Sequence, residues 1–425
     1  MQTKSVFAAT AMAFLLGMGF AQIQKSLAVI PDDLSLETTS SPIALEPEPE
    51  SEPIFQTDLP AQDFSNLTPI PLDRDHLLSS NFIDVRGVGD AAISHNYQQP
   101  PKIDNSLADG VPANFGKRLD RLDPDGQSYR GDLNFINWET VISNSCQLFR
   151  GAPSPRSFAF ITRPENIAAA YERGFNLMGL ANNHSGDCER TEGNIIGSQA
   201  TAYYMSQLRQ ELNTEWLWHG VGNFSKQQAV VREFMIKGKP VKVAFANIYM
   251  GGICQQVACQ VDSEQILNSF DAIAADLKIL SMHSWNEETH QQLVALGEKF
   301  ITKHQGDVVF GHGPHVWKPV TLLDQGNGKK GVMFESLGNF IHPQLLPQGQ
   351  DFIGRALFDL ETLQLAQVQG IPVNVQRAIA TYNNAPNAQS IPSKGFKWQS
   401  IQDTSWGEGL QVNVTGVYHN LTVAP

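Results

Sequence analysis

The stretch VVFGHGPHVW, residues 308–317, joins an apolar run to a turn that carries two histidines. The run Val308–Phe310 has the composition of a β-strand that enters a buried core. Directly after it come His312 and His315, together with two glycines and a proline. Glycine lets a backbone approach an ion or a substrate closely, and proline fixes the path of the chain between the two imidazoles. The stretch therefore predicts a buried strand that ends in a binding turn.

Short apolar runs and longer amphipathic segments alternate along much of the chain. Further strands are expected in DLNFIN (132–137), FNLMGLA (175–181), VKVAFANI (241–248) and LKILSMH (277–283). Helices are expected at 164–174, 197–212, 262–277 and 288–304, the third with Ser263 as its N-cap. Because strands and helices alternate, the sequence predicts an α/β fold.

The two ends of the chain differ in composition from this central region, which we expect to form one domain over residues 82–355. Residues 1–30 combine Lys4 with an apolar, small-residue run, the pattern of a secretory signal peptide, although the run also allows an uncleaved anchor. Residues 31–80 are acidic and rich in proline and serine, which predicts a disordered linker. Residues 356–425 contain alternating apolar and polar residues, which predicts a smaller β-rich extension.

The composition and the predicted signal peptide together indicate where the protein acts and which ligands it does not bind. The formal net charge is -13, and no cluster of lysine and arginine stands out, so a protein that coats nucleic acid is excluded. A signal peptide predicts export, to the periplasm, the cell envelope or the medium. In such an oxidising compartment we expect disulfides, Cys254 with Cys259 and Cys146 with Cys188, while four buried free thiols are the alternative.

Side chains that can bind metals stand just beyond the carboxyl ends of five apolar runs. They are Asp90, Asn137, Glu139, Asn182, Asn183, His184, Asp187, His283, Glu287, His312 and His315. In open α/β sheets, ligands bind beyond the carboxyl ends of the strands. Carboxylates, imidazoles and amide oxygens suit Zn, Mn or Fe, and a pair of such ions can clamp a phosphoester and activate water. We therefore expect a divalent metal site with one ion or two.

Several of these segments resemble the sequence blocks of a known family. ANNHSGDCERTEG (181–193), INWETVIS (136–143) and GVGDAAISH (87–95) are similar to blocks of CapA-type proteins, the poly-γ-glutamate capsule-synthesis family. MHSWNEE (282–288), DVVFGHGPHVWKPV (307–320) and ESLGNFI (335–341) resemble three further blocks, in the family's order. The chain departs from the family where Ser284 and Trp285 replace Trp and Gly, and its opening block lacks the family's methionine and arginine.

This resemblance implies a fold and a set of site residues. The family is related to the calcineurin-like metallophosphoesterases, which implies a four-layer α/β sandwich around two central sheets. His184 resembles the histidine that protonates a leaving group, and Asp187 and Glu287 are further candidate catalytic residues. The implied metal ligands are Asp90, Glu139, Asn183, His283, His312 and His315. Asn137, Asn182 and Asn339 are expected beside the site.

Three functions fit these expectations. The first is an exported, metal-dependent hydrolase that cleaves a phosphoester. The second is hydrolysis of a γ-glutamyl amide at the same site, because an activated water can attack a carbonyl as well as phosphorus. The third is a non-catalytic envelope component that helps assemble or export an anionic polymer, with a membrane-bound polymer synthase as its partner. For such a polymer, this acidic chain would need a bridging cation or a local basic patch.

Overall fold

The computed structural model describes residues 81–93, 115–122, 126, 129–151, 159–252, 255–315, 317–342, 348–376 and 379–382. All of them belong to one unit, residues 51–425. The predicted signal peptide or anchor (1–30), the predicted linker (31–80), Cys254 and residues 383–425 lie outside the described residues. Within the described part of the chain, no helix has the length and apolar character needed to cross a bilayer.

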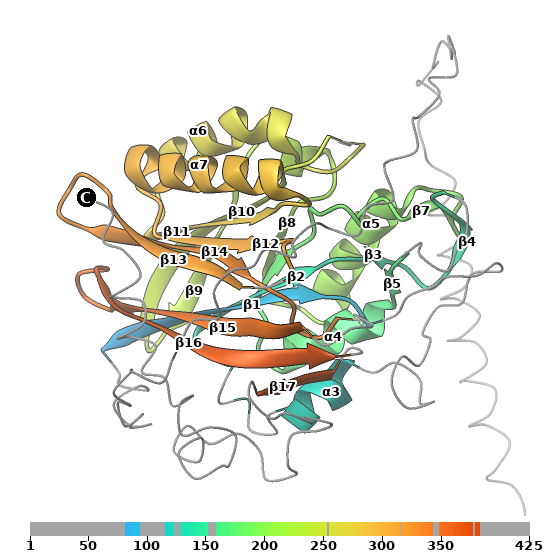
Figure 1. Cartoon of the computed structure of the whole chain (residues 1–425), viewed down its shortest axis with the longest axis horizontal. Helices are drawn as coiled ribbons and strands as arrows, with labels where there is room; N and C mark the ends of the chain where they lie inside the picture. Colours follow the sequence, from blue (N-terminus) through green and yellow to red (C-terminus); the bar gives the residue numbers. More distant parts are fainter. Residues whose placement is uncertain are drawn as a thin grey trace, which may run out of the picture. The chain divides into compact units, whose positions relative to one another are not determined.

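Two mixed sheets form the centre of the fold (Figure 1). The first contains, in spatial order, β17 (Ile379–Tyr382), β16 (Leu365–Gln376), β15 (Gln348–Asp359), β1 (Phe82–Ala91), β2 (Leu133–Trp138), β6 (Leu177–Gly179) and β8 (Leu217–His219). The second contains β13 (Trp317–Asp324), β14 (Lys330–Leu337), β12 (Val308–His312), β11 (Leu277–His283), β10 (Lys239–Tyr249) and β9 (Val230–Ile236). In each sheet four neighbouring strands run parallel, and the strands at the margins are antiparallel.

Helices cover the outer face of each sheet. Helices α6 (Ser263–Ala272) and α7 (Glu287–His304) cover the second sheet, and α3 (Phe115–Leu122), α4 (Pro164–Glu172) and α5 (Gly197–Glu211) pack on the first (Figure 1). The short 3-10 helices η2 (Asn223–Lys226) and η3 (Gln260–Asp262) lie in connections. Two small sheets complete the fold, one of β3 (Val141–Ile142) with β5 (Ile161–Thr162) and one of β4 (Cys146–Phe149) with β7 (Cys188–Thr191).

Three buried cores separate these four layers. Between the sheets, Phe135 of the first stacks on Phe310 of the second with ring centroids 4.9 Å apart. Beneath α6 and α7, Val309 packs with Phe270 and Phe300. Because neighbouring residues of β12 enter different cores, this strand is apolar on both faces, which is why its sequence is a continuous apolar run. The third core joins the first sheet to α3, α4 and α5.

The expected α/β class with two central sheets is confirmed. Each strand and helix predicted above exists, although α6 ends at Ala272 and does not continue to residue 277. Ser263 is the first residue of α6 rather than its cap, because η3 runs directly into the helix. The strands β15, β16 and β17 continue the first sheet beyond β1, and β15 crosses residue 355, where the predicted extension begins.

A buried charge cluster fixes β1 to β15 at the end of the sheet where β1 begins. Arg86 and Arg355 lie directly opposite each other across the two strands, and both donate to the carboxylate of Asp84. All three side chains are almost fully buried. Burial alone would raise the pKa of Asp84, but the two guanidinium groups outweigh it and hold that pKa well below its ordinary value of 3.8. The carboxylate is therefore ionised in the folded protein.

Replacing Asp84 with asparagine should lower the free energy of unfolding by about 3–5 kcal/mol at neutral pH, because it removes the buried negative charge that both guanidinium groups contact. The pKa of Asp84 is lower in the folded protein than in the unfolded chain. The free energy that its carboxylate contributes to folding is therefore fully present above pH 3.8, and it is lost as the pH falls through the folded-state pKa. Urea unfolding at pH 7 measures the effect. The control is Asp120→Asn, which removes a half-exposed partner of Arg173 and should cost under about 1 kcal/mol. Equal losses in the two variants would contradict the prediction.

Candidate metal centre

The carboxyl ends of the parallel strands in the two sheets meet at one place. Asp90, near the end of β1, forms an isolated bridge with Asn339, which follows β14 of the other sheet. The Asp90 N–H donates to the carbonyl of Gly338 at 3.0 Å, and the Asp90 carbonyl accepts from Phe340 at 2.8 Å. These contacts join the sheets at the edge where α/β folds bind their ligands.

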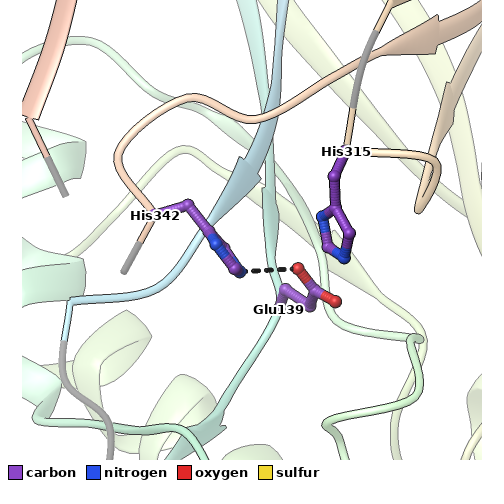
Figure 2. A group of neighbouring side chains, drawn as sticks. All are labelled: Glu139, His315 and His342. Carbon is purple, nitrogen blue, oxygen red and sulfur yellow. Dashed lines mark ion pairs between the residues drawn. The ribbon is translucent and has the colours of Figure 1, made fainter. Parts of the chain in front are cut away.

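Two groups of buried ligand atoms lie at this junction and share Glu139. One consists of Asp90, Glu139 and His283, the other of Glu139, His315 and His342, and the ligand atoms of each group lie within 4.8 Å of one another. His283 is 3.3 Å from Asp90 through Nδ1 and 3.6 Å from Glu139 through Nε2. Figure 2 shows the second group, in which His342 Nε2 lies 2.9 Å from Glu139 Oε2. The carboxylate that follows β2 thus lies among imidazoles supplied by the second sheet.

Several polar atoms at this junction are buried without a hydrogen bond to the described part of the chain. They include Oε1 of Glu139 and Nδ1 of His312, and Oδ1 of Asn183, in the loop that carries His184, is likewise buried without one. A buried polar atom without a partner costs about 1–3 kcal/mol, so such atoms are rare unless they serve an ion or a ligand. Carboxylate, imidazole and amide oxygen together are donors for a divalent metal such as Zn, Mn or Fe. The residues present therefore fit a metal.

Neighbouring groups hold the candidate ligands in position. Asp90 accepts hydrogen bonds from Asn137 Nδ2 at 2.7 Å and from the N–H of Gly313 at 3.0 Å. His312 Nε2 lies 2.8 Å from the hydroxyl of Ser281, which leaves Nδ1 of the same ring available. Such outer contacts fix the orientation of an imidazole and set which nitrogen can bind a metal.

The turn after β12 has the backbone conformation that its sequence suggested. Gly313 has φ 103°, and a Cβ there would lie 1.6 Å from the carbonyl oxygen of Ser284. His315 also has a positive φ, 59°, which is uncommon for a residue with a side chain. Its Nδ1 lies 2.9 Å from Oδ1 of Asn339. The glycine allows the turn to pass close to the neighbouring loop, and the unusual backbone of His315 directs its ring toward the carboxylates.

The loop after β6 brings a histidine and an aspartate to the same place. His184 Nδ1 lies 2.6 Å from Asp187 Oδ2, and His184 Nε2 lies 3.7 Å from Glu139 Oε1. Asn182 supports this loop, because its side chain donates to the carbonyl of Trp138 and accepts from the N–H of His184. Burial lowers the pKa of His184, but the nearby carboxylates, Asp187 above all, outweigh it and raise this pKa to about 9.

Two carboxylates and one imidazole at the junction are in the protonation states that bind a metal. Burial would raise the pKa of Asp90 and Glu139, but the neighbouring imidazoles, His283 for Asp90 and His315 for Glu139, outweigh it and lower both pKa values. Burial lowers the pKa of His312 to about 3, so this ring is neutral. Metals bind ionised carboxylates and neutral imidazoles, so no proton has to be removed from these three residues.

The structure brings most of the predicted site residues together. Asp90, Glu139, His283 and His315 belong to the two groups of ligand atoms, and the His312 ring lies 6.1 Å from that of His283. Asn137, Asn182 and Asn339 contact these residues or their supporting loop, and Asn183 offers its buried Oδ1. The exception is Glu287. It is the first residue of α7, its side chain is 52% exposed, and it lies 4.0 Å from Lys318.

His342 was not expected at the site from the sequence. This residue follows β14 by five positions and is 2% exposed. Burial lowers its pKa. The feature that pointed to the other ligands, a metal-binding side chain just beyond a buried apolar run, is also present at His342. However, His342 stands farther from the end of its strand than the other metal ligands do from theirs.

Comparison with known proteins gives a family, one protein of similar sequence and two similar solved structures. The family described as "Bacterial capsule synthesis protein PGA_cap" matches residues 88–344, more than half of the chain. The capsule biosynthesis protein CapA of Bacillus anthracis is 23% identical over 266 residues, which is 57% of this chain and 60% of that relative. The match thus leaves a substantial part of the relative's length uncovered.

Two solved structures resemble this one at 12% identity. A novel phosphatase of Mycoplasma pneumoniae gives a TM-score of 0.41 and covers 69% of this chain and 94% of its own. A hypothetical protein from Thermus thermophilus gives a TM-score of 0.38 and covers 68% of this chain and 97% of its own.

Proposed function

This chain belongs to the bacterial capsule synthesis protein family PGA_cap, and from that membership we propose that it is an exported, metal-dependent hydrolase acting on an envelope polymer or its precursors. The observation that carries the proposal is the pair of ligand groups that share Glu139. One buried carboxylate whose two oxygens face imidazoles from different loops is suited to hold two divalent ions side by side.

The proposed ligands come from both sheets. Asp90, Glu139 and His283 would hold one ion, and Glu139, His315 and His342 the other. His312 offers Nδ1 beside the first group, provided that its Nε2–H donates to Ser281. A bound pair of ions would supply charge neutralisation and activation of water for attack on a phosphoester or an amide.

The remaining task of a hydrolase is to protonate the leaving group, and His184 is placed for it. Its ring lies at the edge of the ligand groups, 3.7 Å from Glu139, and Asp187 orients it through Nδ1. This leaves Nε2 on the side of Glu139, where a substrate held by the metal centre would lie. The side chain of His184 is 14% exposed, so it can reach a bound molecule.

For substrate and location we propose a phosphoester or γ-glutamyl amide group of an anionic polymer, outside the cytoplasm. The Cys146–Cys188 disulfide, and the disulfide in which Cys259 takes part, support an oxidising compartment. The chain itself is acidic, with formal net charge -13, so cations at the metal centre would be the attraction for an anionic group. A membrane-bound polymer synthase is the partner that such a role predicts.

The test is turnover by purified protein, first stripped of metal and then loaded with Mn²⁺, Zn²⁺ or Fe²⁺. p-Nitrophenyl phosphodiesters and γ-glutamyl p-nitroanilide probe the two chemistries. We expect the metal-loaded protein to hydrolyse at least one of them and the metal-free protein to hydrolyse neither. A folded protein that binds metal fully but turns over neither probe, nor a polymer fragment, would contradict the hydrolase and favour a non-catalytic role in polymer assembly.

A further inference from the structure

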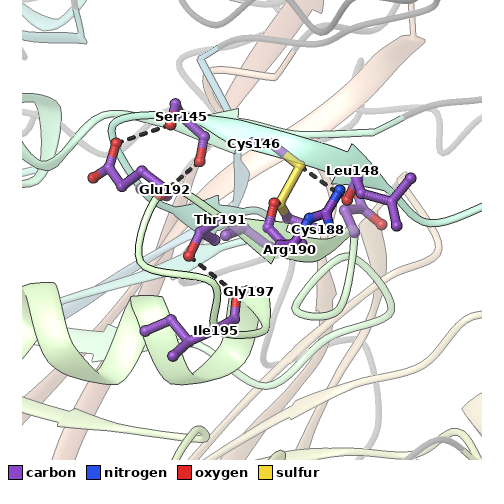
Figure 3. Close-up of a disulfide and its surroundings, with 12 residues drawn as sticks. Ser145, Cys146, Leu148, Cys188, Arg190, Thr191, Glu192, Ile195 and Gly197 are labelled. Carbon is purple, nitrogen blue, oxygen red and sulfur yellow. Dashed lines mark hydrogen bonds between the residues drawn. A yellow bond between two sulfur atoms is a disulfide. The ribbon is translucent and has the colours of Figure 1, made fainter.

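A small cross-linked arm stands beside His184. We call β4 and β7 the disulfide arm; Cys146 at the start of one strand is bonded to Cys188 at the start of the other, with Cα atoms 5.8 Å apart (Figure 3). This is one of the two disulfides that the cysteine spacing suggested, and it is confirmed. The cross-link joins residues 42 positions apart in the sequence.

The disulfide arm shares a small core with the neighbouring sheet of β3 and β5. Cys146 and Cys188 are buried against Val141, Phe149, Ala159 and Ile161, and this cluster is distinct from the three large cores. A core of six residues supplies little hydrophobic stabilisation, and small structural units of this kind depend on cross-links. The disulfide is therefore expected to contribute to the order of this part of the chain.

The residue that orients His184 is attached directly to this arm. Asp187 precedes Cys188, and its carboxylate accepts a hydrogen bond of 2.7 Å from the N–H of Phe160, which lies between two members of this small core. The carbonyl of Asp187 accepts from the N–H of Arg150, just after β4. The backbone of Asp187 is thus fixed to the end of β4, and its carboxylate is held by the segment that enters β5 while it contacts the His184 ring.

Four of the candidate metal ligands lie outside the disulfide arm, whereas the ring of His342 packs beside Phe160 at 5.1 Å between ring centroids. Asp90, Glu139, His283 and His312 lie at the ends of strands in the two large sheets, whose cores are far larger. Contacts also run from the arm toward α5: buried Thr191 donates its hydroxyl to the carbonyl of Ile195, and exposed Glu192 accepts from Tyr204 of α5. Exposed contacts of this kind contribute little to order.

We propose that the Cys146–Cys188 disulfide positions the proton donor: by ordering the arm it fixes Asp187, and through Asp187 the ring of His184, without contributing to the metal centre. This inference rests on the proposed hydrolase function for its effect on turnover. Its structural part, the ordering of Asp187, stands independently. Positioning matters because a displacement of about 1 Å at a catalytic group can cost about 100-fold in rate.

The experiment compares the wild-type chain with the double variant Cys146→Ser/Cys188→Ser. We expect kcat to fall about 10- to 100-fold, with KM and metal content unchanged. Hydrogen exchange should become faster in peptides covering residues 159–162 and 184–191, and should stay unchanged in residues 277–283 and 308–312. The control is Phe270→Leu, a core change beneath α6 that destabilises the fold without touching the arm; it should leave both kcat and the exchange of the arm unchanged.

A double-mutant cycle separates positioning from general damage. Asp187→Asn alone should lower kcat by a similar factor, and adding the two cysteine changes to Asp187→Asn should cause no further loss, because both act through the same ring. Additive losses, loss of metal, or unchanged exchange at residues 159–162 would overturn the proposal. If the wild-type chain turns over no substrate, the hydrolase proposal fails, whereas the exchange comparison still decides whether the disulfide orders Asp187.

Discussion

A protein in which Glu139 is replaced by glutamine is expected to lose nearly all divalent metal binding, with its affinity for Zn²⁺ or Mn²⁺ reduced at least about 100-fold. Mutation of the residues that merely support a metal ligand already lowers metal affinity about 10- to 100-fold, and loss of a ligand should cost at least as much. Glu139 is the one residue common to both groups of ligand atoms, and it is fully buried. Glutamine keeps the size of the side chain but removes the negative charge that balances the ions, and it replaces one donor oxygen by an NH2 group. Both proposed ions should therefore be lost together.

Metal titration by calorimetry and metal analysis after dialysis measure this effect. Glu335→Gln is the matched control, because Glu335 is another carboxylate with little exposure; it lies on the second sheet, accepts from Thr321 and belongs to neither ligand group. It should bind metal as the wild type does. Retention of full metal binding by Glu139→Gln, with the fold intact, would show that the shared carboxylate is not a ligand.

The second large effect is expected for His184→Gln, which should lower kcat about 100- to 10,000-fold, the usual contribution of a positioned general acid. Metal content should not change, because His184 belongs to neither group of ligand atoms. The variant keeps a polar side chain in the loop after β6 but cannot donate a proton as an imidazolium does.

Steady-state kinetics and metal analysis on the same preparation separate these two outcomes. The matched control is His304→Gln, since His304 also pairs with an aspartate, Asp271, at 2.9 Å, but at the far end of α7. Its kcat should stay within about twofold of the wild type, because a change this far from the site removes no interaction made in the transition state. A His184 variant with unchanged turnover would exclude this residue as the proton donor, and a variant that lost metal would make it a ligand instead.

Much of this fold could be read from the sequence because its strands are buried on both faces. Val308–Phe310 forms a continuous apolar run since its side chains alternate between two cores, and the apolar side chains of β11 likewise divide between these cores. Parallel strands place their carboxyl ends along one edge, so polar residues that follow such runs were expected to meet. Asp90, Glu139 and His283 do so.

Other parts could not be predicted because they depend on local geometry. Glu287 stands four residues after His283, which suggested a common site, but Asn286 caps α7 at this point and Glu287 lies near Lys318. The role of His342 depends on how the chain turns back after β14 toward Glu139, and no periodicity encodes that path. Likewise, the small core around Cys146 is assembled from segments too short to show a pattern.

The most direct test of the metal centre is anomalous diffraction at the zinc edge from crystals of the full chain grown with Zn²⁺. We predict at least one anomalous peak at about 2.0–2.2 Å from a carboxylate oxygen of Glu139, the normal zinc–oxygen distance, with His283 or His342 among the other ligands. Zinc bound only elsewhere on the protein, with Glu139 and its neighbouring imidazoles arranged as described and no density between them, would contradict the account.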